Sequence, residues 1–316
     1  MNLKNTMFIL VIVVFLLQMV VMKQDAAIAL KEEKIVLKKT IALSTFPLYD
    51  IAKNIAKDKL QTYMILPAGV DVHSYEPNPK DIVKLHKSAL VVYSGAELEP
   101  WISHLNFKNK TIDMSKHVEL INLDALSHKE HTHHDDSCKH GSFDPHYWLS
   151  VDNMILATKQ ITGAIIELDL QNKDFYLNNQ KEYLQSLKTL DALYKSTLAT
   201  CQINEIITNH NAFSYLGQSY GFEILSLSAL SPEAQVNAKS MVRLIEHIKE
   251  HNTSTLFYES FASSKAINSV AKEANVKIEV LQPLANITAD EQKQNVSYED
   301  IMKQNLVKLK QAMHCQ

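Results

Sequence analysis

Three histidines occupy sequence positions where imidazole nitrogen could bind a metal ion. His73, His146 and His210 lie in the segments GVDVHSYEP, DPHYWL and NHNAFSYL, respectively. Neutral imidazole is a good ligand for Zn²⁺, and three such groups leave one vertex of a tetrahedral site open. A single histidine of this kind is more often a hydrogen-bonded structural residue. The metal hypothesis therefore depends on whether the fold brings the three together.

A second group of histidines is dense in the sequence. Of the 14 histidines in the chain, six lie between His128 and His146. Segment 128–140 reads HKEHTHHDDSCKH, and its polarity and lack of periodicity predict a surface loop. Such a loop offers weak, exchangeable sites for metal capture, and the alternative is a tolerated insertion with incidental affinity. The histidines of this loop are His128, His131, His133, His134 and His140.

Strands that alternate with helices are expected throughout the rest of the chain, which favours a parallel sheet in each half. The predicted strands are 40–45, 62–66, 90–93, 118–123, 205–208, 223–227, 255–258 and 277–281. The predicted helices are 48–57, 79–87, 98–105, 212–220, 232–250, 265–274 and 298–313.

A long helix is expected between the two halves, because no glycine or proline occurs from Ala164 to Leu216. Apolar residues recur at helical spacing over 174–199, which predicts a helix about 39 Å long with a break near Gln171 and Asn172. This helix would connect the halves as a strut, and an ordinary surface helix is the alternative.

The three isolated histidines share a position in this pattern. Each follows the carboxyl end of a predicted strand and precedes a predicted helix, and ligands bind at that edge in open α/β sheets. His73 and His146 come from the first half and His210 from the second. A cleft between the halves would bring all three together.

The chain resembles the solute-binding proteins of bacterial zinc/manganese ABC importers, most closely the zinc-uptake branch. The resemblance rests on the three motifs, the glycine-free helix and the histidine-rich loop, which occur in the same order. The resemblance runs from about residue 38 to the C-terminus. It implies an α/β fold of two Rossmann-like lobes, mainly parallel sheets flanked by helices, joined by one long linking helix with the metal in the interlobe cleft. The implied divisions are a signal peptide over 1–29, an N-terminal lobe over 30–170 that includes the loop 128–140, a linking helix over 171–200 and a C-terminal lobe over 201–316.

The resemblance also implies the metal ligands. His73, His146 and His210 fall on the first three ligand positions, and manganese members have glutamate at the third, so His210 favours Zn²⁺ over Mn²⁺. Many members have aspartate at the fourth position, where this chain has Gln282. Water, Gln282 or Glu259 are the candidates for that vertex, and for Glu259 a hydrogen-bonding role beside the ligands is favoured over ligation.

The implied function is that of an exported carrier, not an enzyme, which captures Zn²⁺ and delivers it to the membrane permease of an ABC importer. It is expected to act as a monomer. Alternatives are a metal-binding adhesin or zinc buffer of the same fold, a manganese carrier, and a zinc hydrolase. The chain has no H-E-x-x-H or G-x-S-x-G motif, which disfavours the hydrolase.

Composition excludes other classes. The formal net charge is -3 and Arg243 is the only arginine, so the chain lacks the basic array of a nucleic-acid binder. Its six glycines form neither glycine-rich phosphate loop.

The N-terminus and the cysteines indicate export. The apolar run Met7–Met22 followed by Ala27-Ile-Ala29 predicts a signal peptide cleaved after Ala29 and a periplasmic location, with an uncleaved anchor as the alternative. No cysteine follows the run, so a lipid anchor is not expected. In an exported protein Cys201 and Cys315 could form a disulfide. The remaining histidines, expected to be solvated, are His86, His104, His117, His247, His251 and His314.

Overall fold

The computed structural model describes residues 18–19, 39–123, 142–228, 238–251, 253–259 and 265–316. The chain forms two compact units, Met1–Lys38 and Lys39–Gln316, and the fold below is that of the second. Within the described residues, no helix combines the length and the apolar character needed to cross a membrane. Segment 1–29, predicted to be a signal peptide, and segment 128–140, predicted to be a loop, lie outside the described residues, apart from positions 18–19.

The first half contains a four-stranded sheet in the order β2-β1-β3-β4, and every neighbouring pair is parallel. Helix α2 packs on this sheet and presents Ile51 and Ile55 to the core, while α3 begins at Pro79 with a capping box built on Asn78. The elements are β1 (Thr40–Leu43), α2 (Phe46–Ala56), β2 (Gln61–Met64), α3 (Pro79–Lys87), β3 (Leu90–Tyr93), the 3₁₀ helix η1 (Pro100–His104), β4 (Lys110–Asp113) and the 3₁₀ turn η2 (Met114–Lys116).

Two predictions for this half are wrong. The fourth strand is β4 (Lys110–Asp113), not 118–123, because β4 lies at the sheet edge and carries exposed polar residues that hide its pattern. The backbone of 118–123 instead bonds to side chains from elsewhere: Glu119 donates to Asn153 and Ile121 to the Tyr215 hydroxyl. The helix predicted over 98–105 is the shorter η1.

The second half contains a parallel sheet in the order β6-β5-β7-β8. Ile207 and Leu256 on this sheet pack with Ile248 and Val270 from two covering helices to form a separate apolar core. The elements are β5 (Glu205–His210), α7 (Ser214–Tyr220), β6 (Glu223–Ser228), α8 (Ala238–His251), β7 (Thr255–Tyr258), α9 (Lys265–Ala274), β8 (Lys277–Val280), α10 (Ala289–Lys293) and α11 (Tyr298–Ala312). The prediction of parallel α/β sheets in both halves is confirmed.

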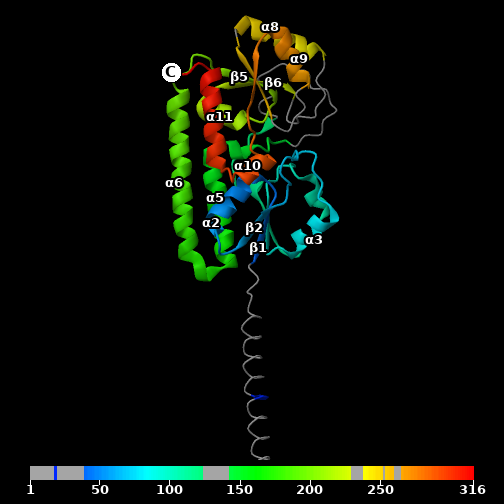
Figure 1. Ribbon diagram of the computed structural model, residues 1–316, viewed down its shortest axis with the longest axis vertical. Helices are drawn as coiled ribbons and strands as arrows, with labels where there is room; N and C mark the ends of the chain where they lie inside the picture. Colours follow the sequence, from blue (N-terminus) through cyan, green and yellow to red (C-terminus); the bar gives the residue numbers. More distant parts are fainter. Residues whose placement is uncertain (1–17, 20–38, 124–141, 229–237, 252, 260–264) are drawn as a thin grey trace, which may run out of the picture. The chain divides into compact units, whose positions relative to one another are not determined.

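Three long helices run side by side along one side of the two sheets (Figure 1). They are α5 (Val151–Leu168), α6 (Lys173–Leu198) and α11; the 3₁₀ turn η4 (Leu170–Asn172) between α5 and α6 matches the predicted helix break. The 26 residues of α6 span about 39 Å at 1.5 Å per residue. Hydrogen bonds from α6 reach α2 through Tyr183 and Asp50, and α11 through the Tyr194 hydroxyl and the Met302 carbonyl. The helix therefore contacts elements that adjoin both sheets.

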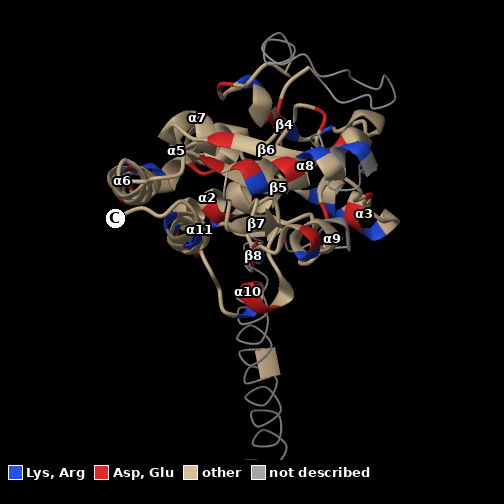
Figure 2. Cartoon of the chain, turned by 90° about the horizontal axis from the view of Figure 1, so that it is seen from above, with Lys and Arg blue, Asp and Glu red and all other residues tan. Residues whose placement is uncertain are grey.

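The C-terminus is attached to the end of α6. The structure joins Cys201 and Cys315 in a disulfide, and Met313 accepts backbone hydrogen bonds from Gln202 and Ile203. Lysine and acidic residues are interspersed on α3, α8 and α9 (Figure 2), so none of these helices presents a purely basic face.

Candidate metal site

The three isolated histidines are positioned by different elements. His73 lies in the connection between β2 and α3, His146 directly precedes the 3₁₀ turn η3 (Tyr147–Leu149), and His210 is the last residue of β5. His210 is thus part of a strand, although the sequence pattern ended that strand two residues earlier. His146 follows a backbone bridge between Asn122 and Phe143 instead of a sheet strand.

The fold brings these three side chains together. One ring nitrogen from each lies within 4.8 Å of the others. The ring centroids are 5.4 Å apart for His73 and His146, 5.5 Å for His146 and His210, and 5.9 Å for His73 and His210. His146 and His210 are fully buried, and His73 is partly buried. Because Zn–N bonds of about 2.0–2.1 Å place tetrahedral ligands about 3.4 Å apart, inward movements of roughly an ångström suffice to enclose an ion.

Buried carboxylates orient two of the imidazoles. Asp144 Oδ1 accepts hydrogen bonds from Nδ1 and the backbone N–H of His146, at 2.8 and 2.9 Å. Glu259 Oε1 lies against Nδ1 of His210. A ligand histidine commonly donates its other ring N–H to a carboxylate, which fixes the tautomer and leaves Nε2 for the metal. The contact between Asp144 and His146 matches that arrangement, and Glu259 lies on the corresponding Nδ1 side of His210.

Burial sets the protonation states of His210 and Glu259. Removal from water, together with the neighbouring His146, lowers the pKa of His210 from 6.5 to about 3. The same loss of solvation raises the pKa of Glu259 well above its usual range. His210 is therefore neutral, which is the form that binds metals.

A buried nitrogen in this cluster lacks a protein partner. His210 Nε2 makes no hydrogen bond to any described residue. An unsatisfied buried polar atom costs about 1–3 kcal/mol, so proteins rarely retain one without a use. A metal ion bound at Nε2 would remove that cost.

Gln282, the residue predicted at the fourth position, lies in the connection after β8. Its amide nitrogen donates to both carboxylate oxygens of Glu291, each at 3.1 Å, and its Oε1 is buried without a hydrogen-bond partner among the described residues. The next residue, Pro283, accepts a hydrogen bond from Trp148 Nε1, and the Trp148 ring packs edge-on against His146. Trp148 therefore links this connection to the histidine cluster, and the Gln282 amide oxygen accepts no hydrogen bond from any described residue.

Two aspartates were missed by the sequence analysis. Asp71 Oδ1 accepts the backbone N–H of His73, as Asp144 does for His146, so the same D-x-H turn precedes both histidines. The repeated Asp-x-His spacing in the sequence could have predicted these contacts, since an aspartate side chain commonly accepts a hydrogen bond from the backbone N–H two residues later. The five loop histidines and Cys138 lie outside the described residues.

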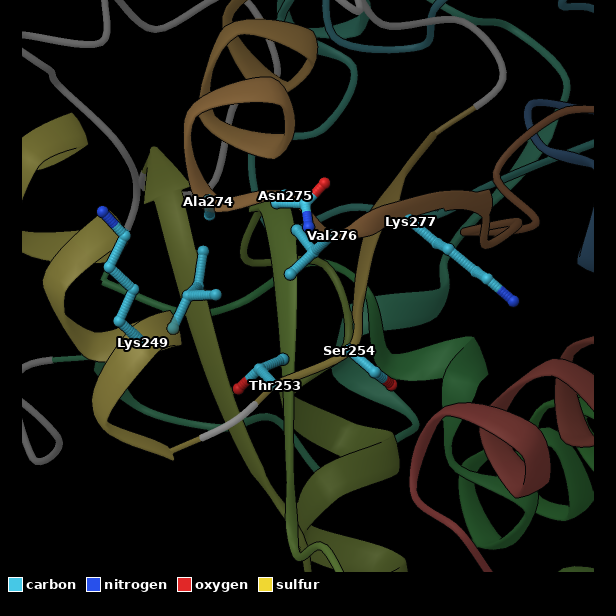
Figure 3. A pocket seen from close by; sticks show the side chains of 8 residues that line it. Lys249, Thr253, Ser254, Ala274, Asn275, Val276 and Lys277 are labelled. Carbon is cyan, nitrogen blue, oxygen red and sulfur yellow. The ribbon is translucent and has the colours of Figure 1, made fainter.

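A separate pocket of about 590 Å³ lies at the opposite end of the second sheet, where β7 and β8 begin (Figure 3). Its lining includes Lys249, Thr253 and Lys277. It contains none of the three clustered histidines and takes no part in the candidate metal site.

Comparisons with known proteins agree with this fold. The family described as zinc-uptake complex component A, periplasmic, matches residues 41–312. The high-affinity zinc uptake system protein ZnuA of Bacillus subtilis is 35% identical over an alignment of 282 residues, which covers 86% of this chain and 87% of that protein.

Solved structures with similar folds cover the same region. The Zn(II)-bound ZnuA-like domain of Streptococcus pneumoniae AdcA has a TM-score of 0.72 and 29% identity, covering 87% of this chain and 99% of that one. The laminin binding protein Lmb of Streptococcus agalactiae, described as bifunctional with adhesin and metal transporting activity, has a TM-score of 0.75 and 26% identity, with the same coverage.

Proposed function

Because this chain belongs to the zinc-uptake complex component A family of periplasmic proteins, we propose that it captures Zn²⁺ between His73, His146 and His210 and delivers it to the membrane permease of an ABC importer. The observation that carries the proposal is the convergence of three imidazoles from both halves of the fold. The ion is cargo, so the chemistry is reversible binding without a catalytic step.

Capture follows from the placement of the ligands. His73 and His146 belong to the first half, and His210 is the last residue of β5 in the second half. An ion bound by all three therefore connects the two halves. We assign the first half to an N-terminal lobe over 30–170, the second to a C-terminal lobe over 201–316, and the segment 171–200 to the linking helix. Closure on the ion would change the surface that the permease meets, and release there would reverse it.

The ligand set favours Zn²⁺ over Mn²⁺. Imidazole suits zinc, whereas manganese prefers carboxylate, carbonyl and water oxygens. All three assigned ligands are nitrogens, and Glu259 lies on the Nδ1 side of His210, away from Nε2. For the fourth vertex we propose Gln282 Oε1 or water, since that oxygen is buried and unpartnered within the described part of the chain.

The remaining properties of the carrier extend this proposal. We propose that residues 1–29 are removed on export and that the mature chain works in the periplasm as a monomer, since one copy supplies all three histidines. N-terminal sequencing of the exported protein and its mass in solution test these two points. Segment 128–140 would bind zinc weakly and pass it to the cleft.

Competition titration with a zinc chelator tests the ligand assignment. Single replacements His73→Ala, His146→Ala and His210→Ala are each expected to weaken tight Zn²⁺ binding at least tenfold, because each removes one of three nitrogen ligands. The matched control is His104→Ala, at an exposed histidine outside the cluster. Unchanged affinity in any of the three cluster variants would remove that residue from the site.

Adhesion is the second candidate function, favoured by the similarity to Lmb. It predicts that deleting the protein leaves zinc uptake under zinc limitation unchanged while attachment to laminin falls. The carrier predicts the reverse.

A further inference from the structure

A second cluster of potential metal ligands lies in the C-terminal half, on residues expected to be solvated or left unassigned. Glu205, His247 and His251 each place one ligand atom within 4.8 Å of the others. Glu205 is the first residue of β5, and both histidines belong to the last turns of α8. Since β5 ends at His210, this cluster and the first one lie at opposite ends of one strand, about 17 Å apart at 3.3 Å per residue.

The two histidines have the spacing that lets a helix present a pair of ligands. Residues four apart lie on the same helix face, and the rings of His247 and His251 have centroids 3.9 Å apart. Both lie in the last two turns of α8, which ends at His251, and the unpaired carbonyls of a helix end carry partial negative charge that favours a cation. The helix therefore supplies two nitrogens and a favourable field.

Hydrogen bonds direct the ring nitrogens of this pair. His251 Nδ1 lies 3.2 Å from the His247 carbonyl oxygen, so Nδ1 carries the proton and donates it, and Nε2 retains its lone pair. A backbone carbonyl is one of the usual acceptors for the second N–H of a ligand histidine. His251 is thus set in the tautomer that a metal requires.

Glu205 completes the set from the sheet. His247 Nε2 lies 3.0 and 3.2 Å from its two carboxylate oxygens, and Thr253 donates to the same carboxylate at 3.4 Å. The Glu205 side chain is 14% exposed and that of His247 is 28% exposed, whereas His251 is open to solvent. An ion can enter from solvent and bind Nε2 of His247 once the proton on that nitrogen leaves, to solvent from a protonated imidazole or to Nδ1 from a neutral one.

We propose that Glu205, His247 and His251 form a second binding site for a divalent metal ion of borderline hardness. Zn²⁺ is the ion used to test it. Two imidazoles and one carboxylate leave the other coordination positions to water. Imidazole nitrogen selects zinc, nickel and copper ions over calcium and magnesium, which prefer oxygen ligands. An ion here would cross-link the end of α8 to the start of β5.

Site-resolved protection of His251 tests the proposal. Full-length protein with one equivalent of Zn²⁺ is treated with diethyl pyrocarbonate before and after addition of more Zn²⁺, and each histidine is followed by peptide mass spectrometry. We expect the added zinc to slow modification of His251 at least tenfold and that of the exposed control His104 less than twofold. The same addition of Ca²⁺ should protect neither. Equal modification of His251 with and without zinc would overturn the proposal.

Variants separate this site from the first one. Glu205→Gln is expected to abolish zinc protection of His251, and His146→Ala, in the first cluster, to leave it intact. Calorimetric titration provides the second measurement: His251→Gln should bind one equivalent of Zn²⁺ fewer than the unmodified chain, while His104→Gln should bind the same number. His251→Gln at full stoichiometry would refute the second site, whatever the His146→Ala variant shows about the first.

Discussion

Replacing Asp144 by asparagine tests whether a carboxylate that never touches the metal sets zinc affinity. Asp144 is fully buried, and its Oδ1 receives both the ring Nδ1–H and the backbone N–H of His146. Asparagine keeps the size and one acceptor oxygen but removes the negative charge. The change therefore isolates the electrostatic support of His146 from the position of its ring.

The size of the effect follows from this geometry. The 2.8 Å contact is a charge-assisted hydrogen bond that becomes stronger when zinc draws electron density from the imidazole. Loss of such a partner typically lowers metal affinity 10–100-fold, equal to about 1.4–2.7 kcal/mol of binding free energy. His146→Ala removes the ligand itself and should cost more.

Competition titration against a fluorescent zinc chelator measures the change, with thermal unfolding of the apo-protein as a check on folding. Asp81→Asn is the matched control, because Asp81 caps α3 in the first half and has no contact with the histidine cluster among those described. Binding by Asp144→Asn within twofold of the unmodified chain, at unchanged apo stability, would refute the reasoning.

Three further predictions concern proton release, pH-dependent stability and the disulfide. Burial raises the pKa of Glu259 and lowers that of His210, so without metal Glu259 is protonated and His210 is neutral. Zinc binding should therefore release one proton from Glu259, and zinc affinity should fall as pH falls. Glu259→Gln should abolish that release in calorimetry across buffers of different ionisation enthalpy, and unchanged release would contradict the assignment. Burial raises the pKa of Asp50 from 3.8 to about 6, so the folded state binds more protons in that window and the free energy of unfolding falls as pH rises from 4 to 7. The loss is about 3 kcal/mol at 1.36 kcal/mol per pKa unit, and urea unfolding of Asp50→Asn should lack it; parallel pH profiles would exclude a raised pKa. Replacing Cys201 and Cys315 by serine should lower the free energy of unfolding by about 3–5 kcal/mol, because the bridge closes a loop of 114 residues, and a change below about 1 kcal/mol in urea titration would show that the bridge adds little.

Local patterns predicted many elements well. The bounds of α3, α9, β3 and β7 agree with the predictions, and η4 marks the predicted break before α6. The two strands are short and mostly apolar, and each of the two helices has apolar residues at helical spacing, so neighbouring residues suffice to define them. The strand β4 (Lys110–Asp113) was missed because an edge strand does not need an apolar pattern.

The candidate site divides in the same way. The motifs around His73, His146 and His210 are local, so the sequence alone could single them out and predict that they meet. The predicted position after a strand is right for His73 and His210 and wrong for His146, which follows the bridge between Asn122 and Phe143. The partners that orient them are less local. Glu259 meets His210 across 49 positions of the chain, and Trp148 meets Pro283 across 135.

What the amino-acid sequence by itself determined is the alternation of strands and helices, the helix connecting two halves and the identity of three histidines. Only the tertiary structure decided which nitrogen each ring offers, which carboxylates lie behind them, and that Glu205 meets His247 and His251. The physical reason is that helix and strand formation depend on neighbouring residues, whereas ring orientation and burial depend on groups that folding alone brings close.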